Sequence, residues 1–173
     1  MQGLKFRKTN IVKIVKESLS KFACPGRIAV SVKSMLDDET VWIDHEQMVG
    51  ILTDLVQNAV EAMPEKGMLT VIVAGDEQQV ILKIMDTGKG ISEENLPLLF
   101  TPFYTTKPAG DGTGLGLPQA FSTIKAHSGD ISITSNADPG KGPTGTEIKI
   151  TLPRRQTFQA KETKIFLHEE EPL

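Results

Sequence analysis

The sequence predicts an α/β domain in which helices are layered on a mixed β-sheet. Segments with the apolar spacing of helices alternate with segments typical of strands, and this alternation places helices against a sheet. Residues 68–85 and 130–152 each hold two predicted strands joined by a tight turn, which requires antiparallel neighbours. A purely parallel, doubly wound sheet is therefore a poor fit.

The predicted helices have apolar residues three and four positions apart, between a polar start and a glycine or proline stop. They cover about 9–24, 45–63 and 115–128, with a shorter helix from 92 to about 100. Asp44 caps the second helix, with Gln47 placed for a capping box, and Gly129 is the expected left-handed cap of the third. The predicted strands are 28–32, 40–43, 68–74, 79–85, 131–135 and 147–152.

Length and composition indicate one domain with a core. The chain has 173 residues, of which 39% are hydrophobic. Its apolar runs are too short to cross a bilayer and no secretion leader is visible, so we expect no membrane contact by this chain. The single cysteine, Cys24, fits a reducing compartment, which predicts a cytoplasmic location even if a parent protein is membrane-anchored. Three scattered histidines and one cysteine argue against structural zinc.

Charge is unevenly distributed along the chain. The formal net charge is −3, yet residues 1–33 carry +7 and the remainder −10. A basic start is typical of a nucleic-acid arm or of the solvated face of a docking helix. We favour the helix and expect no nucleic acid, because no aromatic residues interleave with the bases.

Two glycine clusters indicate a nucleotide. Asp86-Thr87-Gly88-Lys89-Gly90-Ile91 follows a buried strand, and Gly112-Thr113-Gly114-Leu115-Gly116-Leu117 opens a helix, where backbone amides can hold phosphates. The P-loop pattern GxxxxGK[ST] is absent, and GxGxxG fails in both clusters because the third position is Glu93 or Gln119. Each cluster alone is weak evidence, since glycine turns are common.

A third element strengthens the hypothesis. Asn58 lies one helical turn after Asp54, beside the small residues Ala59 and Ala62. The ordered set of Asn58, Asp86-x-Gly88-x-Gly90, Phe100 with Phe103, and Gly112-x-Gly114-x-Gly116 resembles the N, G1, F and G2 boxes of the GHKL ATP-binding fold. Sensor histidine kinases, type II topoisomerase ATPase subunits, the Hsp90 chaperone and MutL-type repair proteins share this fold. The resemblance covers about residues 44–153, and 99–107 resembles histidine kinases of the nitrogen-regulator type.

The resemblance implies a two-layer sandwich, the Bergerat or GHKL fold, whose mixed and mostly antiparallel sheet is covered on one face by about three helices. It also implies that Asp86 accepts a hydrogen bond from the adenine amino group, and that Asn58 binds Mg²⁺ through its side-chain oxygen. Guanine offers a carbonyl there instead, a mismatch of roughly 1–3 kcal/mol or more. The other implied ATP-binding residues are Ala62, Gly88, Gly90, Ile91, Lys107, Gly112, Thr113, Gly114, Leu115, Gly116, Leu117 and Thr146.

The roles of Lys107 and Asp54 have alternatives. Lys107 is a candidate partner of the γ-phosphate or simply a mobile loop lysine. Asp54 matches an acid that activates water in the ATPase branches of the superfamily. A histidine acceptor is mostly neutral at pH 7 and needs little help from a base, so we expect Asp54 to orient the acceptor or the metal's waters. Phe100 and Phe103 are expected to anchor the lid, about 92–113.

The phosphoacceptor hairpin of a complete histidine kinase is missing. His45-Glu46 imitates its motif, but Gly50 and the absence of a nearby proline argue against it. We therefore expect a catalytic domain at 28–153, with 1–27 as its first helix and a linker from a missing dimerisation hairpin, and 154–173 as a polar tail. The expected partners are that hairpin and, indirectly, a response regulator; ADP would be the product. The alternatives are an ATPase, a serine kinase or an ATP-gated interaction module without catalysis.

Overall fold

The computed structural model describes residues 3–21, 26–108 and 112–155. Its main sheet has five strands in the order β2-β4-β5-β7-β6, and β1 pairs with β3 in a separate two-stranded sheet. The strands are β1 (Phe6–Asn10), β2 (Ile28–Ser34), β3 (Thr40–Asp44), β4 (Gly67–Gly75), β5 (Gln79–Asp86), β6 (Asp130–Asn136) and β7 (Gly145–Pro153). Among the described strands only β2 and β4 pair in parallel, so the sheet is mixed and mostly antiparallel, as predicted.

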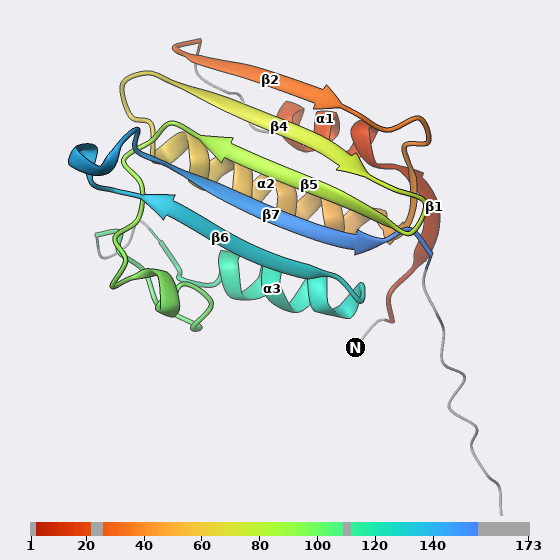
Figure 1. Ribbon diagram of the computed structural model, residues 1–173. Coiled ribbons are helices and arrows are strands. Elements are labelled where there is room, and N and C mark those ends of the chain that lie inside the picture. The colour runs from red at the N-terminus through yellow and green to blue at the C-terminus, as the bar shows by residue number, and fades with distance from the viewer. Residues whose placement is uncertain (1–2, 22–25, 109–111, 156–173) are drawn as a thin grey trace, which may run out of the picture.

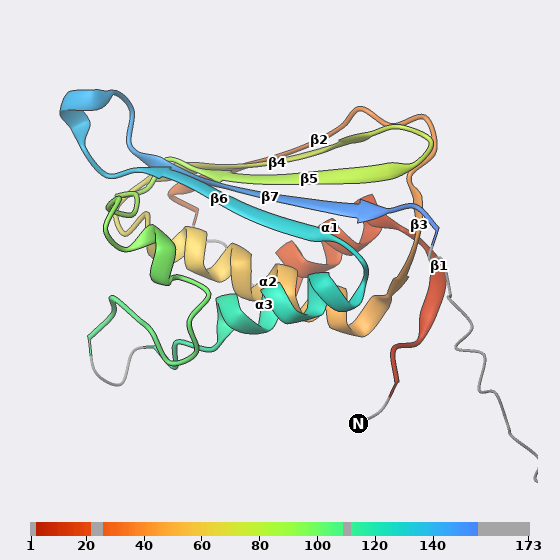
Figure 2. The ribbon, with the colours of Figure 1, turned by 60° about the horizontal axis from the view of Figure 1, so that its bottom comes forward.

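In the part of the chain that the structure describes, three α-helices lie on one face of the five-stranded sheet and none lies on the other face (Figures 1 and 2). They are α1 (Ile11–Lys21), α2 (His45–Glu61) and α3 (Gly116–Ala126), and α2 lies between the other two. One buried cluster joins all three helices to the sheet. The structure therefore confirms the predicted two-layer sandwich. Within the described residues no helix is long and apolar enough to cross a membrane.

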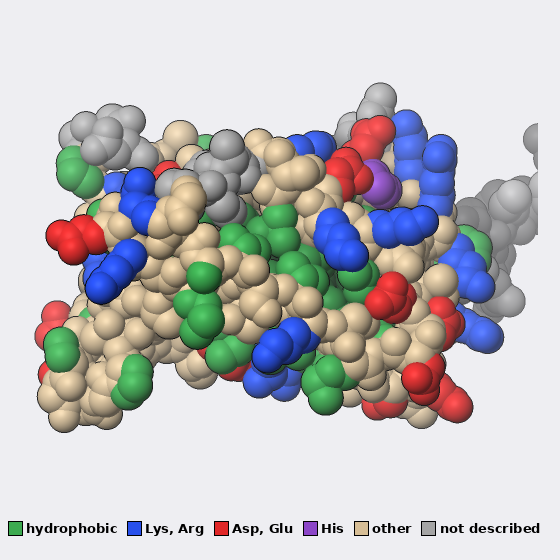
Figure 3. Space-filling model, turned by 90° about the horizontal axis from the view of Figure 1, so that it is seen from above, with side chains coloured by type: hydrophobic (Ala, Val, Ile, Leu, Met, Phe, Trp, Pro, Cys, Tyr) green, Lys and Arg blue, Asp and Glu red, His purple; other side chains and the backbone are tan. Residues whose placement is uncertain are grey.

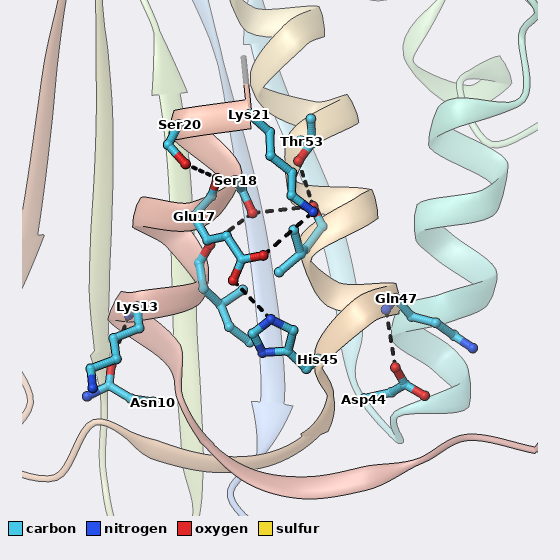
Figure 4. Close-up of polar contacts among 12 residues, drawn as sticks. Asn10, Lys13, Glu17, Ser18, Ser20, Lys21, Asp44, His45, Gln47 and Thr53 are labelled. Atoms are coloured by element: carbon cyan, nitrogen blue, oxygen red, sulfur yellow. Dashed lines mark hydrogen bonds and ion pairs between the residues drawn. The ribbon is translucent and has the colours of Figure 1, made fainter. Parts of the chain in front are cut away.

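Helix α1 belongs to this core. Its apolar face, with Ile11 and Ile14 fully buried, packs against α2, while Lys13 and Lys16 are exposed. Figure 4 shows the polar side of this contact, where the Glu17 carboxylate lies 2.9 Å from the His45 ring. The prediction that the basic start of the chain includes the solvated face of a docking helix is thus confirmed.

Viewed from the β2 side, apolar side chains gather in the middle of the surface with Lys and Arg around them (Figure 3).

A buried histidine joins the ends of two helices to the small sheet. His127 is fully buried, and its Nε2 accepts a hydrogen bond of 3.0 Å from the backbone amide of Asp44. Its Nδ1 lies 2.8 Å from the carbonyl oxygen of Thr123, which fixes the tautomer with the proton on Nδ1. The ring also meets Phe6 of β1 edge-on at 5.1 Å.

Local structure differs from the sequence prediction in five places. The Asp44 side chain caps α2 through Gln47 N at 3.2 Å, but His127 takes the backbone amide that a full capping box would use. The expected helix at 92–100 is only a 3₁₀ turn, η1 (Leu96–Leu98), and a second, η2 (Pro139–Lys141), precedes β7. The left-handed residue after α3 is Ser128, with φ 57°, and not Gly129 as predicted. Position 129 needs a glycine for a different reason, because a Cβ there would lie 2.5 Å from a carbonyl oxygen of β7.

The other two differences concern the edges of the domain. Strand β1 was not predicted, and it pairs with β3 along its whole length. Arg154, assigned by the sequence to the polar tail, donates hydrogen bonds to the carbonyl oxygens of Asp38 (2.7 Å) and Thr40 (2.9 Å). Ordered contacts therefore extend past the predicted end at residue 153, whereas residues 156–173 of the predicted tail lie outside the described part of the chain.

Candidate functional site

The predicted site residues gather at one end of the sandwich. The C-terminal ends of β5 and α2 meet there, beside the segment that follows η1 and the start of α3 (Figure 2). Asp86 is the last residue of β5 and lies between two strands, opposite Leu69 of β4 and Thr146 of β7. The central strand thus carries its carboxylate to the point where the sheet meets the helices.

Asp86 is half-buried and held in place by a backbone amide. The Gly88 amide donates to Asp86 Oδ1 at 2.8 Å. Burial raises the pKa of Asp86 above its ordinary value, and the backbone amides of Gly88 and Thr146 only partly oppose the rise. An ionised carboxylate has acceptor sites beyond the one that the Gly88 amide fills, so it can accept a further N–H from a ligand.

Gly88 and Gly90 have different local reasons to be glycine. A Cβ on Gly88 would lie 2.6 Å from the carbonyl oxygen of Ala62 and 2.8 Å from Asp86 Oδ1, so a side chain would fill the space beside the carboxylate. Gly90 has φ +71°, and a Cβ there would lie 1.9 Å from the carbonyl oxygen of Asn136. The Lys89 amide donates to the Ala62 carbonyl at 3.0 Å, which ties this loop to the end of α2.

A serine that the sequence did not single out connects Ile91 to Thr146. Ser135 Oγ accepts from the Ile91 amide and donates to the Gly145 carbonyl, both at 2.8 Å. Its single proton is used there, so the Thr146 hydroxyl donates to Ser135 Oγ across 2.8 Å and keeps its own oxygen free to accept. Ser135 faces Thr146 only through the β6–β7 register, which no short motif reveals.

Helix α2 brings Asn58 to the same end of the domain. Lys107 Nζ donates to Asn58 Oδ1 at 3.2 Å and forms an ion pair with Glu61, one turn further along. Burial alone would raise the pKa of Glu61, but the hydrogen bonds from Lys107 and Gln57 and the lysine's charge lower it. The Asn58 oxygen therefore lies in a position that already attracts a cation.

Asp54 is exposed on α2, and within the described part of the chain it makes no hydrogen bond or ion pair. Partial burial nevertheless raises the pKa of its carboxyl group. The side chain stands one turn before Asn58 on the same helix, and its predicted role stays a prediction.

The second glycine cluster leads directly into α3. The helix begins at Gly116, and no described side chain caps it at Leu115, which leaves the first amides available for an anion. Among the described residues, a Cβ on Gly116 would meet nothing within 4 Å, so no described side chain covers the backbone there. The Phe103 amide donates to the Gly114 carbonyl at 2.9 Å and closes the loop, although residues 109–111 lie outside the described residues.

The two phenylalanines of this segment behave differently. Phe100 packs against the core, and its ring lies 5.1 Å from that of Phe121 on α3, so it anchors the segment as predicted. Phe103 is 75% exposed at a left-handed backbone position with φ 67°, so the prediction that it is an anchor is wrong. The predicted apolar wall of Ala62, Ile91 and Leu117 is half-buried, as a surface shared by core and ligand would be.

The residues present fit a magnesium–adenine nucleotide. The carboxylate of Asp86 lies beside the backbone of Gly88, which has no side chain to fill the adjacent space. The Asn58 side-chain oxygen already accepts from a cation, and the first amides of α3 have no side-chain cap. These features suit, respectively, an exocyclic amine, a divalent metal with hard oxygen ligands, and phosphates.

Known proteins are similar to this chain in both sequence and fold. The family described as "Histidine kinase-, DNA gyrase B-, and HSP90-like ATPase" matches residues 43–156, about two thirds of the chain. Sporulation kinase A of Bacillus subtilis (strain 168) is 31% identical over 149 residues, which are 84% of this chain but 23% of that kinase. Sensor histidine kinase ZraS of Escherichia coli (strain K12) is 35% identical over 103 residues, 60% of this chain and 21% of ZraS.

Two solved structures show the same architecture. The nucleotide-free catalytic domain of histidine kinase ThkA has a TM-score of 0.75 and 26% identity, covering 87% of this chain and 98% of that one. The mycobacterial sensor histidine kinase MprB also has a TM-score of 0.75 and 26% identity, covering 88% and 100%. The chain belongs to the histidine kinase-, DNA gyrase B- and HSP90-like ATPase family. Within that family it has the fold of the catalytic ATPase domain of sensor histidine kinases, and it spans about a quarter of the length of the curated kinases that it matches.

Proposed function

We propose that this domain binds Mg·ATP and transfers the γ-phosphoryl group to a histidine on a partner hairpin, which then supplies a response regulator. The observation that carries the proposal is the half-buried Asp86 carboxylate, which accepts a hydrogen bond from the Gly88 amide at the end of the central strand. Membership of the ATPase family supports ATP as the ligand, and the relatives named sensor or sporulation kinases support histidine as the acceptor.

We assign each side chain near Asp86 a role in holding the nucleotide. Asp86 would accept the adenine amino group, with Thr146 reaching the base through water and Gly88 and Gly90 letting the backbone pass close by. Ala62, Ile91 and Leu117 would supply the apolar walls. The amides of Gly112, Thr113, Gly114, Leu115 and Gly116 would hold the phosphates.

At the phosphate end, Asn58 would hold Mg²⁺, which supplies charge neutralisation at the transferring phosphoryl group when bound. Lys107 would contact the γ-phosphate, and Asp54 would orient the acceptor or the metal's waters. The chain's contribution is mostly positioning and charge stabilisation. The product would be ADP.

The finer assignments are also proposals. The run Leu99–Lys107 favours the nitrogen-regulator type of kinase, and the location would be cytoplasmic. In a longer protein, residues 1–27 would lead from the dimerisation hairpin through β1 and α1, residues 28–153 would form the catalytic unit with the lid at about 92–113, and 154–173 would form a polar tail. One solved relative is a complex of histidine kinase ThkA with a response regulator protein, which supports a regulator as the eventual partner.

The test is phosphotransfer from radiolabelled ATP to a separately purified phosphoacceptor hairpin from a histidine kinase, with an alanine replacing its histidine as control. We expect acid-labile, alkali-stable label on the hairpin and very slow hydrolysis by the domain alone. Rapid ATP hydrolysis without an acceptor, abolished by Asp54→Asn, would replace this proposal with an ATPase. Label on serine, or protection of the lid from protease by ATP without any transfer, would replace it with a serine kinase or with an ATP-gated module.

A further inference from the structure

A carboxylate outside the predicted set holds the lysine of the lid. Glu61, on the last turn of α2, pairs through Oε2 with Lys107, and its other oxygen accepts a hydrogen bond of 2.9 Å from Gln57 Nε2. Both carboxylate oxygens are thus engaged, one by the helix and one by the lid. Because Gln57 precedes Glu61 by one turn, the helix itself orients the carboxylate.

The lysine lies across the region where phosphates are expected. Its ammonium rests on Asn58 Oδ1, while a Cβ on Gly112 would come within 3.0 Å of Lys107 Cδ. The stem therefore runs between the end of α2 and the first glycine of the second cluster. Both side chains of the ion pair are only about one third exposed, at 35% for Lys107 and 38% for Glu61.

The ammonium and a metal ion need the same oxygen. A magnesium ion lies about 2.0–2.1 Å from its oxygen ligands, whereas Lys107 Nζ is 3.2 Å from Asn58 Oδ1. Two cations on one amide oxygen would stand only a few ångströms apart and would repel each other strongly in this partly buried place. Binding of the metal at Asn58 must therefore displace Lys107, and phosphate oxygens offer the displaced ammonium a new partner.

We propose that Glu61 is a positioning residue that holds Lys107 on the metal-binding oxygen of Asn58 in the nucleotide-free domain, and that Mg·ATP binds by exchanging this ion pair for a contact between Lys107 and phosphate. The inference rests on the proposed function. It gives Glu61 a defined sign: the residue weakens nucleotide binding, because its ion pair has to open first. The lowered pKa of Glu61 agrees with a formed ion pair at neutral pH.

Calorimetric titration with Mg·ATP tests the sign in wild type, Glu61→Gln, Lys107→Met and the double variant. We expect Glu61→Gln to bind about two- to fivefold more tightly, the range that a partly exposed ion pair supports. In the Lys107→Met background the same glutamine should change nothing, since no lysine is left to hold. Glu46→Gln is the matched control, because it removes one exposed acid from the opposite end of the same helix and should bind like wild type.

Each other result identifies what is wrong. Weaker binding by Glu61→Gln would mean that the carboxylate helps to hold the metal, and equal binding would mean that the ion pair is irrelevant; both overturn the inference. An equal gain in the Lys107→Met background would overturn it as well, because the effect would then be plain repulsion between Glu61 and phosphate. If wild type itself fails to bind Mg·ATP, the proposed function falls together with the inference. If wild type binds and Glu61→Gln gains nothing, only the inference falls.

Discussion

Replacing Asp86 with asparagine should weaken Mg·ATP binding about 5- to 150-fold. The Gly88 amide donates to Asp86 Oδ1, so one end of this side chain must stay an acceptor. An asparagine can turn its oxygen toward this amide or toward the adenine amino group, but not toward both. Either orientation sets an N–H against an N–H, and one such unmade hydrogen bond costs about 1–3 kcal/mol, which corresponds to the stated loss.

Calorimetry on wild type and Asp86→Asn measures the loss directly, and thermal unfolding checks the fold. Burial raises the pKa of Asp86 in the folded state, so its ionised form opposes folding at neutral pH and this cost disappears as the pH falls through the raised pKa. The free Asp86→Asn domain should therefore be at least as stable as wild type at pH 7. Equal affinities of the two proteins for Mg·ATP would refute the assignment of the base to this carboxylate.

The same carboxylate predicts how binding depends on pH. Only the ionised form presents two acceptors, so the affinity advantage of wild type over Asp86→Asn should be full above the raised pKa of Asp86 and shrink as the pH falls through it. The ratio of the two affinities is the quantity to follow, because titration of the nucleotide's own phosphates cancels. A ratio that declines only near pH 3.8, where an ordinary aspartate titrates, would show that burial has no effect on this group.

Two further substitutions, each paired with a control substitution, probe packing. Gly88→Ala places a methyl group 2.6 Å from a backbone oxygen at the end of α2 and should cost about 1–3 kcal/mol of stability and most of the nucleotide affinity. Its control is Gly50→Ala on α2, where no described atom lies near the added methyl group, and this substitution should stabilise the domain by about 0.5–1 kcal/mol. His127→Ala leaves the buried Asp44 amide without its acceptor and should cost about 2–4 kcal/mol in denaturant unfolding. His45→Ala removes only a partly exposed contact with Glu17 and should cost less than about 1 kcal/mol, and equal costs for the two histidines would contradict this prediction.

Local patterns predicted the parts of the fold that local physics controls. Apolar spacing identified the three helices and the six strands that build the core, because burial of one face imposes that spacing. Strand β1 escaped notice because it carries Arg7 and Lys8 in the middle and is held by pairing with β3, which lies far away in sequence. The helix expected at 92–100 contains Pro97, which lacks the amide that a continuing helix needs, and only a single 3₁₀ turn forms.

The residues of the candidate site also fall into those that a local motif indicates and those that depend on distant parts of the chain. Asp86, Gly88 and Asn58 could be placed near one another before the structure because they stand in short motifs that resemble the ordered boxes of the GHKL fold, and their roles stay proposals. Ser135 and Glu61 could not be placed in this way, since the first depends on the β6–β7 register and the second on where a lysine 46 residues away comes to rest. Phe103 was expected to be an anchor because it pairs with Phe100 in the box that resembles the family, whereas in the structure it is 75% exposed at a left-handed backbone position.

The direction of α2 has a consequence for how a phosphate acceptor could reach this domain. The helix starts beside β1, at the Asp44–His127 contact, and its seventeen residues end at the phosphate side, a span of about 25 Å. A histidine hairpin fused ahead of β1 would be tethered at the far pole of the sandwich. For transfer, its histidine would have to come to the opposite end of the domain, either through the length of the hairpin itself or through rotation of the whole domain about that tether.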